Sequence, residues 1–118
     1  MKTSLVAVMT AAVIGGTALA ASAQDAKVEA GKALYATHKC AVCHQIKGVG
    51  MKPPTGFALD GVGTKVPAAD LKKWLTDPAA MEAKLPTKPK MSMAGAMKGK
   101  KLTDADVDAL VAYMLSLK

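Results

Sequence analysis

Arginine is missing from the sequence, and all 16 basic side chains are lysines. Against nine acidic residues they give a formal net charge of +7. A basic chain can bind nucleic acid, but proteins that read bases rely heavily on arginine. We therefore expect no nucleic-acid partner. An acidic protein surface is the partner that this charge favours.

Aromatic residues are also scarce, because Tyr35, Phe57, Trp74 and Tyr113 are the only four. With 118 residues, the chain has the length of one small domain. Small domains bury a modest fraction of their surface and often need a covalent or metal staple. Four aromatic residues are too few to fill an apolar core. A buried, covalently held cofactor would supply the missing apolar volume.

Long apolar runs are lacking outside the N-terminus. There, Lys2 gives a positive start, residues 5–20 are apolar, and a small-residue cleavage site ends at Ala23. A retained membrane anchor is the alternative, but the run is slightly short for a spanning helix, which needs about 20 apolar residues. We predict a secretory signal peptide over residues 1–23, export to the periplasm and one mature domain over residues 24–118.

The sequence has only two cysteines, and Cys40, Cys43 and His44 form a Cys-x-x-Cys-His motif. This motif is the attachment site of a c-type haem. Two thiols at this spacing can add to the two vinyl groups on one edge of the porphyrin, and the next imidazole can bind the iron from one face. We predict one covalent haem c held by Cys40 and Cys43, with His44 as an axial iron ligand.

Three other uses of Cys40, Cys43 and His44 fit the sequence less well. A structural disulfide between Cys40 and Cys43 is compatible with an oxidising compartment. A thioredoxin-like redox site belongs near a βαβ pattern, which the sequence does not show. A zinc site needs four ligands, and His38 would have to join the motif residues from one short loop.

The apolar periodicity predicts three helices. The first covers residues 24–37, and the second covers residues 66–77 and ends before a proline. The last begins after Thr103, which is a suitable N-cap, with Asp106 in the position of a capping box. The pattern is that of an all-α domain.

Two long loops are expected between these helices. Residues 45–63 are rich in glycine and proline, which predicts a loop without strand pairing. Residues 81–97 form the second predicted loop, which Pro86 and Pro89 interrupt. Four of its seventeen residues are methionines: Met81, Met91, Met93 and Met97.

A haem iron with one histidine ligand either takes a second axial ligand or keeps an open site. His38 is a poor second ligand, because the cysteines that follow it hold its segment at the attachment edge of the porphyrin. A methionine sulfur from the second loop can approach the opposite face and raises the reduction potential. Methionine more commonly fills a core, but four in one loop favour a ligand.

The whole mature chain resembles the class I c-type cytochromes, the mono-haem cytochrome c family. Residues 31–35 are similar to the glycine and aromatic residue of the family's first helix, and residues 110–113 to the last-helix motif that crosses it. Residues 59–63 resemble the turn below the haem. The resemblance implies a small all-α fold of three to four helices, with long loops wrapped around one covalently attached haem.

The resemblance also selects the axial methionine. Residues 89–95 look like the family's Lys-Met segment with Ala-Gly three residues later, which places the axial sulfur on Met91. Additional residues before the last helix leave Met93 and Met97 as alternatives.

A proline near the haem is less clearly matched. In the family, its carbonyl accepts a hydrogen bond from the axial histidine and orients the ring. Phe57 occupies the corresponding place here, so we transfer the role to Pro54 or Pro53.

The resemblance implies an electron carrier rather than an enzyme. Single electrons would pass between a donor and an acceptor redox protein, and no substrate would react at an iron with both axial positions filled. The alternatives are a dedicated haem c subunit of a periplasmic dehydrogenase, and a gas-binding or peroxidase-like protein with an open iron. We expect no membrane anchor after signal cleavage, and either a monomer or a subunit of a redox complex.

Overall fold

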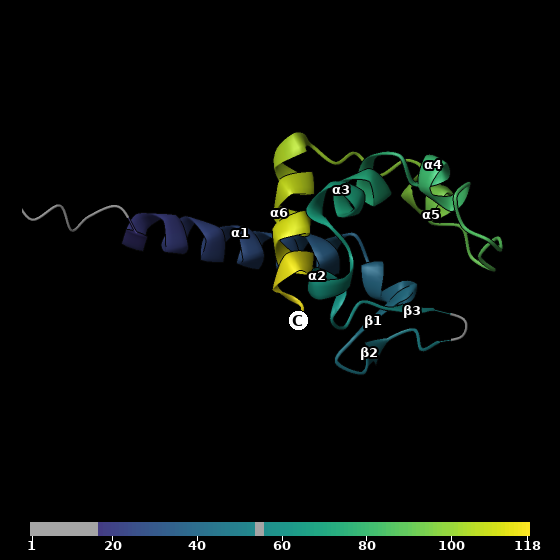
Figure 1. Ribbon diagram of the computed structural model, residues 1–118, viewed down its shortest axis with the longest axis horizontal. Coiled ribbons are helices and arrows are strands. Elements are labelled where there is room, and N and C mark those ends of the chain that lie inside the picture. Colours follow the sequence, from purple (N-terminus) through teal and green to yellow (C-terminus); the bar gives the residue numbers. More distant parts are fainter. Residues whose placement is uncertain (1–16, 54–55) are drawn as a thin grey trace, which may run out of the picture.

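The computed structural model describes residues 17–53 and 56–118 (Figure 1). Most of the predicted signal peptide, including Lys2, and also Pro54 lie outside the described residues. Helix α1, Thr17–Thr37, ends where the sequence predicts but begins before residue 24, because the alanine-rich segment around the predicted cleavage position favours helix. Its first half projects from the domain in Figure 1. Cleavage after Ala23 stays a prediction.

Helices α1 and α6, Asp104–Ser116, cross at the centre of the domain (Figure 1). A Cβ atom on Gly31 would overlap the backbone carbonyl of Ala109 and lie 2.7 Å from Cβ of Tyr113. The glycine therefore lets the two backbones approach, as its resemblance to the family's first-helix glycine implies. Tyr35 and Tyr113 reinforce the crossing, with ring centroids 5.9 Å apart in an edge-to-face arrangement.

The start of α6 has the predicted capping box. The Thr103 hydroxyl accepts a hydrogen bond from the Asp106 amide at 3.2 Å, and the Thr103 amide donates to the Asp106 carboxylate at 2.9 Å. These bonds satisfy two groups at a helix end that otherwise lack intrahelical partners.

Helix α3, Ala68–Thr76, packs on α6 and matches the second predicted helix. It is preceded by the short α2, Val62–Lys65. The structure corrects the prediction of one loop over residues 81–97, because α4, Pro78–Glu82, and α5, Met93–Met97, occupy its two ends. Both short helices have N-caps: Asp77 accepts from the Ala80 amide at 3.2 Å, and Ser92 accepts from the Gly95 amide at 3.1 Å.

The prediction of a loop without strand pairing over residues 45–63 is wrong, because three short strands pair there. Strand β1, His44–Ile46, pairs antiparallel with β2, Val49–Gly50, and parallel with β3, Phe57–Ala58, in the order β2-β1-β3. Pro53 falls in the connection between β2 and β3, so its missing N–H removes no bond from this sheet.

The three main helices, α1, α3 and α6, confirm the mostly helical fold class. Among residues 17–53 and 56–118, no helix is both long and apolar enough to cross a membrane.

Gly31→Ala is expected to destabilise the domain by about 3 kcal/mol, because the new methyl group meets backbone rather than a movable side chain. Thermal unfolding of the purified holoprotein measures the effect. Gly95→Ala is the matched control, since a Cβ there meets only the Ser92 side chain at 3.7 Å. It should leave the melting temperature unchanged or raise it slightly. Equal losses in both variants would contradict the close helix crossing.

Candidate haem site

The two cysteines lie at one tight turn after α1. A short 3-10 helix, Cys40–Val42, follows Lys39, and the Cys43 amide donates to the Cys40 carbonyl at 3.1 Å. Both cysteines are half-buried free thiols. Burial raises the pKa of the Cys40 thiol, and the nearby Lys100 ammonium partly offsets that rise. The turn thus presents two unpaired thiols from one short segment.

His44 follows directly and is the first residue of the central strand β1. The backbone around it is held on both sides: the Phe57 amide donates to the Cys43 carbonyl at 2.9 Å, and the Tyr35 hydroxyl donates to the His44 carbonyl at 3.2 Å. The Phe57 ring lies 6.5 Å from the imidazole, centroid to centroid. The pairing of β1 with β3 therefore fixes the direction in which the His44 side chain points from the backbone.

The imidazole of His44 carries a buried nitrogen, Nδ1, that has no hydrogen-bond partner among the described residues. Pro53 is therefore not its acceptor in this structure, and Pro54 lies outside the described residues. Burial lowers the pKa of the imidazole, which favours its neutral form. A neutral imidazole is the form that binds a metal.

Tyr35 connects this histidine to the helix crossing. Its ring packs against Tyr113 of α6, and its hydroxyl reaches the His44 carbonyl. Burial raises the pKa of Tyr35 to about 12, so the hydroxyl remains a donor at neutral pH. Its place in the first-helix pattern was evident from the sequence, but its bond to the residue after the second cysteine was not.

The four methionines of residues 81–97 lie in different surroundings. Met81 is buried in α4 as a core residue. Met93 and Met97 are the first and last residues of α5, and Met91 lies two residues before that helix; all three are half-buried.

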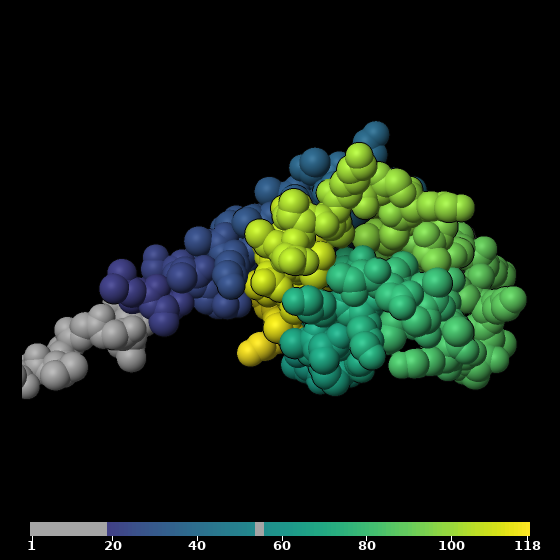
Figure 2. Space-filling view, turned by 90° about the horizontal axis from the view of Figure 1, so that it is seen from above, coloured from purple at the N-terminus to yellow at the C-terminus, as the bar shows by residue number. Residues whose placement is uncertain are grey.

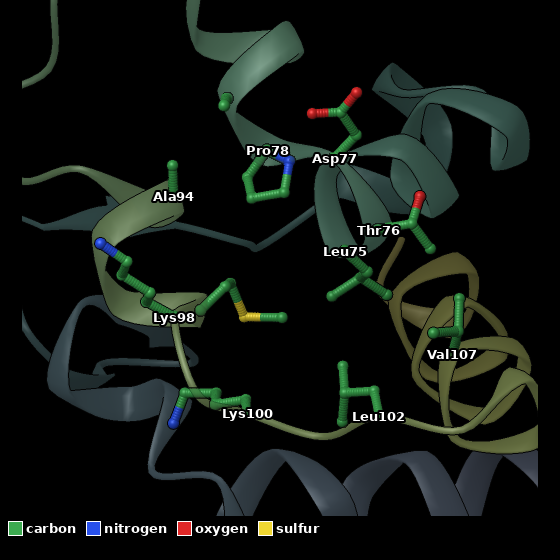
Figure 3. Close-up of a pocket in the computed structure, with 11 residues that line it drawn as sticks. Leu75, Thr76, Asp77, Pro78, Ala94, Lys98, Lys100, Leu102 and Val107 are labelled. Carbon is green, nitrogen blue, oxygen red and sulfur yellow. The ribbon is translucent and has the colours of Figure 1, made fainter.

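A cavity of about 410 Å³ lies among α3, α4, α5 and the start of α6 (Figure 3). In Figure 3, Ala94, Lys98 and Lys100 line one side, and Leu75, Leu102 and Val107 line the other. Met97 also lines this cavity, whereas Met91 does not.

Lys100 joins this cavity to the attachment segment. Its ammonium group donates to the His38 carbonyl at 2.8 Å, two residues before Cys40. The contact spans 62 positions of sequence, and no local pattern could have predicted it. Glu82, which binds the start of α5, is a second residue whose contact no local sequence pattern predicts.

The described residues fit a covalently held haem. They provide two free thiols at the attachment spacing and a neutral imidazole next to them. A cavity with a mixed polar and apolar lining is bordered by Lys100, the residue that contacts this segment. In the described part of the chain, the buried apolar side chains are few, and no aromatic residue is among them. The core therefore leaves room for the apolar group that the scarcity of aromatic residues suggested. Among the described residues, the buried core consists of Ile46, Leu71, Met81, Val107, Ala109, Leu110 and Ala112.

A zinc site is not supported by the same residues. Over residues 17–53 and 56–118, no three His, Cys, Asp or Glu side chains are placed to hold a metal ion together. The four ligands that the zinc alternative requires are thus not gathered in this part of the chain.

Comparison with known families agrees with the geometry. The family described as Cytochrome c matches residues 28–118, which is most of the chain. The protein belongs to the cytochrome c family, whose members are typically haem-based electron carriers. No curated protein and no solved structure matched the chain.

Proposed function

We propose that the protein is a mono-haem electron carrier that passes single electrons between two redox proteins and transforms no substrate. The observation that carries the proposal is the free-thiol pair of Cys40 and Cys43 next to His44, within a chain of the cytochrome c family. Bound haem c would supply a one-electron iron couple. The chain's own part is to hold that group, to set its ligands and to exclude water around it.

Each site residue has a separate role in this proposal. Cys40 and Cys43 hold the haem through thioethers, and His44 binds the iron from the side of the attachment turn. Met91 provides the second ligand, with Met93 and Met97 as the alternatives. A neutral thioether favours the reduced iron and raises the potential, and two filled axial positions leave no place for a substrate.

Export to the periplasm is part of the same proposal. It is supported by the charged, apolar and small-residue segments that end at Ala23. The mature protein would then act without a membrane anchor, either as a monomer or within a redox complex.

The proposed partner presents an acidic surface, and lysines near residues 91–97, here called the methionine segment, would attract it. This segment occupies the end of the molecule opposite the projecting half of α1 (Figures 1 and 2). Of the six lysines that flank Met91, five are exposed, and Lys100 instead binds the His38 carbonyl. Exposed charges of one sign at one end guide an oppositely charged partner. The six are Lys84, Lys88, Lys90, Lys98, Lys100 and Lys101.

Electron transfer to an acidic acceptor protein is expected to slow as salt rises, because ions screen attraction beyond about 8 Å at physiological ionic strength. Reversing Lys88 and Lys90 to glutamate should slow the reaction roughly tenfold at low salt. Stopped-flow rates at several ionic strengths measure this effect.

The control reverses Lys27 and Lys32, which are exposed on α1. The haem spectrum must stay unchanged in both variants, since Lys90 is next to the proposed ligand. A flat salt dependence, or equal slowing by the two pairs, would mean that the lysines serve solubility and that the partner docks by apolar contact.

A further inference from the structure

One carboxylate joins α4 to the methionine segment. Glu82, the last residue of α4, accepts a hydrogen bond from the Ala94 amide at 2.9 Å and from the Ser92 hydroxyl at 2.9 and 3.1 Å to its two oxygens. The Ser92 hydroxyl in turn accepts from the Gly95 amide. One acidic side chain therefore organises the whole start of α5.

The hydrogen bonds to Glu82 are charge-assisted. Hydrogen bonds to a carboxylate are shorter and stronger than those between neutral groups. The bond from the Ala94 amide, helped by the Ser92 hydroxyl, lowers the pKa of Glu82, so the side chain stays charged at neutral pH. The amide of Ala94 is one of the first groups of α5 and has no partner within the helix.

The segment between the two partners has few other restraints. Residues 83–92 join α4 to α5, and most of their side chains are exposed. Beyond the far end of the methionine segment, Lys100 binds the His38 carbonyl and provides a separate restraint. Loss of the Glu82 bonds should therefore release the start of α5 while the rest of the domain stays folded.

We propose that Glu82 is a positioning residue for the axial methionine: its bonds to Ser92 and Ala94 hold the methionine segment against the rest of the fold, so that the sulfur stays on the iron. The inference rests on the proposed methionine ligand. It applies to Met91 and Met93 alike, since one lies immediately before Ser92 and the other immediately after it.

The test measures how easily a foreign ligand displaces the methionine. Ferric holoprotein is titrated with imidazole, and loss of the weak far-red band that a methionine sulfur gives to ferric haem reports displacement. Because the segment must open first, the apparent imidazole affinity reports the cost of opening. Glu82→Ala should raise the apparent imidazole affinity about tenfold, which is the expected effect of losing charge-assisted hydrogen bonds.

Two graded variants and one control accompany Glu82→Ala. Glu82→Gln keeps an acceptor but loses the charge, and Ser92→Ala keeps the Ala94 bond; each should give a smaller rise. Glu29→Gln is the control, because Glu29 is the only other glutamate and is exposed on α1. Global unfolding, followed by circular dichroism, should shift far less than the imidazole affinity. If Glu82→Ala fails to fold, the graded pair carries the same comparison.

The outcomes separate this inference from the function on which it rests. A wild-type protein without the far-red band overturns the methionine ligand and the role of Glu82 together. A wild-type protein with the band, in which the Glu82 variants bind imidazole no more tightly than Glu29→Gln, overturns the role of Glu82 alone. A parallel loss of global stability and ligand retention would show general destabilisation and also overturn it.

Discussion

Changing Cys40 and Cys43 together to alanine is expected to release all haem from the polypeptide on acid-acetone extraction. Each thiol can form one thioether, so a single change leaves at most one bond and the double change leaves none. We also expect poor accumulation of folded protein, because a small domain whose described residues include no buried aromatic side chain depends on its cofactor for much of its core.

The measurement is haem staining after denaturing electrophoresis, together with extraction. Val42→Ala is the matched control, since Val42 lies between the two cysteines, is 57% exposed and leaves both thiols in place. It should keep the haem attached. Haem that stays with the double cysteine variant after denaturation would contradict thioether attachment at this motif.

Met91→Ala is expected to abolish the far-red band completely and to lower the reduction potential by about 0.1 V or more, within the range of about 0.8 V that axial ligands set. Loss of the Met91 sulfur removes a neutral ligand that favours reduced iron. The reduced variant should also bind carbon monoxide at neutral pH, which a held methionine prevents. Absorption spectra and a potentiometric titration measure these three effects.

Met93→Ala and Met97→Ala are the comparison, and both should keep the band. Met97 is the stricter control, because it lines the cavity among α3, α4, α5 and α6 whereas Met91 does not. If Met93→Ala or Met97→Ala loses the band while Met91→Ala keeps it, the assignment of Met91 as the ligand is wrong. The assignment of the chain to the cytochrome c family would not be affected.

The features that the sequence predicted well depend on contacts near in sequence or on family resemblance. The capping box of Thr103 and Asp106 joins residues three apart, and the structure confirms it. At Gly31, the local signal is a glycine inside a helix, whose cost makes sense if another backbone approaches closely there. The family resemblance supplies the partner, the last helix, and the structure confirms this crossing.

The missed features are short or depend on distant partners. Strands β2 and β3 have two residues each, too few for alternation to show, and β3 is placed by the bond from Phe57 to Cys43 across fourteen residues. Helices α4 and α5 have five residues each, below the length at which helical periodicity can be recognised. Glu82 reaches Ser92 ten residues on, across a segment with two prolines, so spacing alone could not pair them.

The intact mass of the exported protein under denaturing conditions is the decisive test for a covalently attached haem. Protein produced in a host with haem-attachment machinery should have the mass of residues 24–118 plus one haem. That single value checks the cleavage after Ala23 and the covalent cofactor on Cys40 and Cys43 together. A mass equal to the polypeptide alone, with free thiols or with a disulfide, would contradict the assignment of a covalent haem carrier.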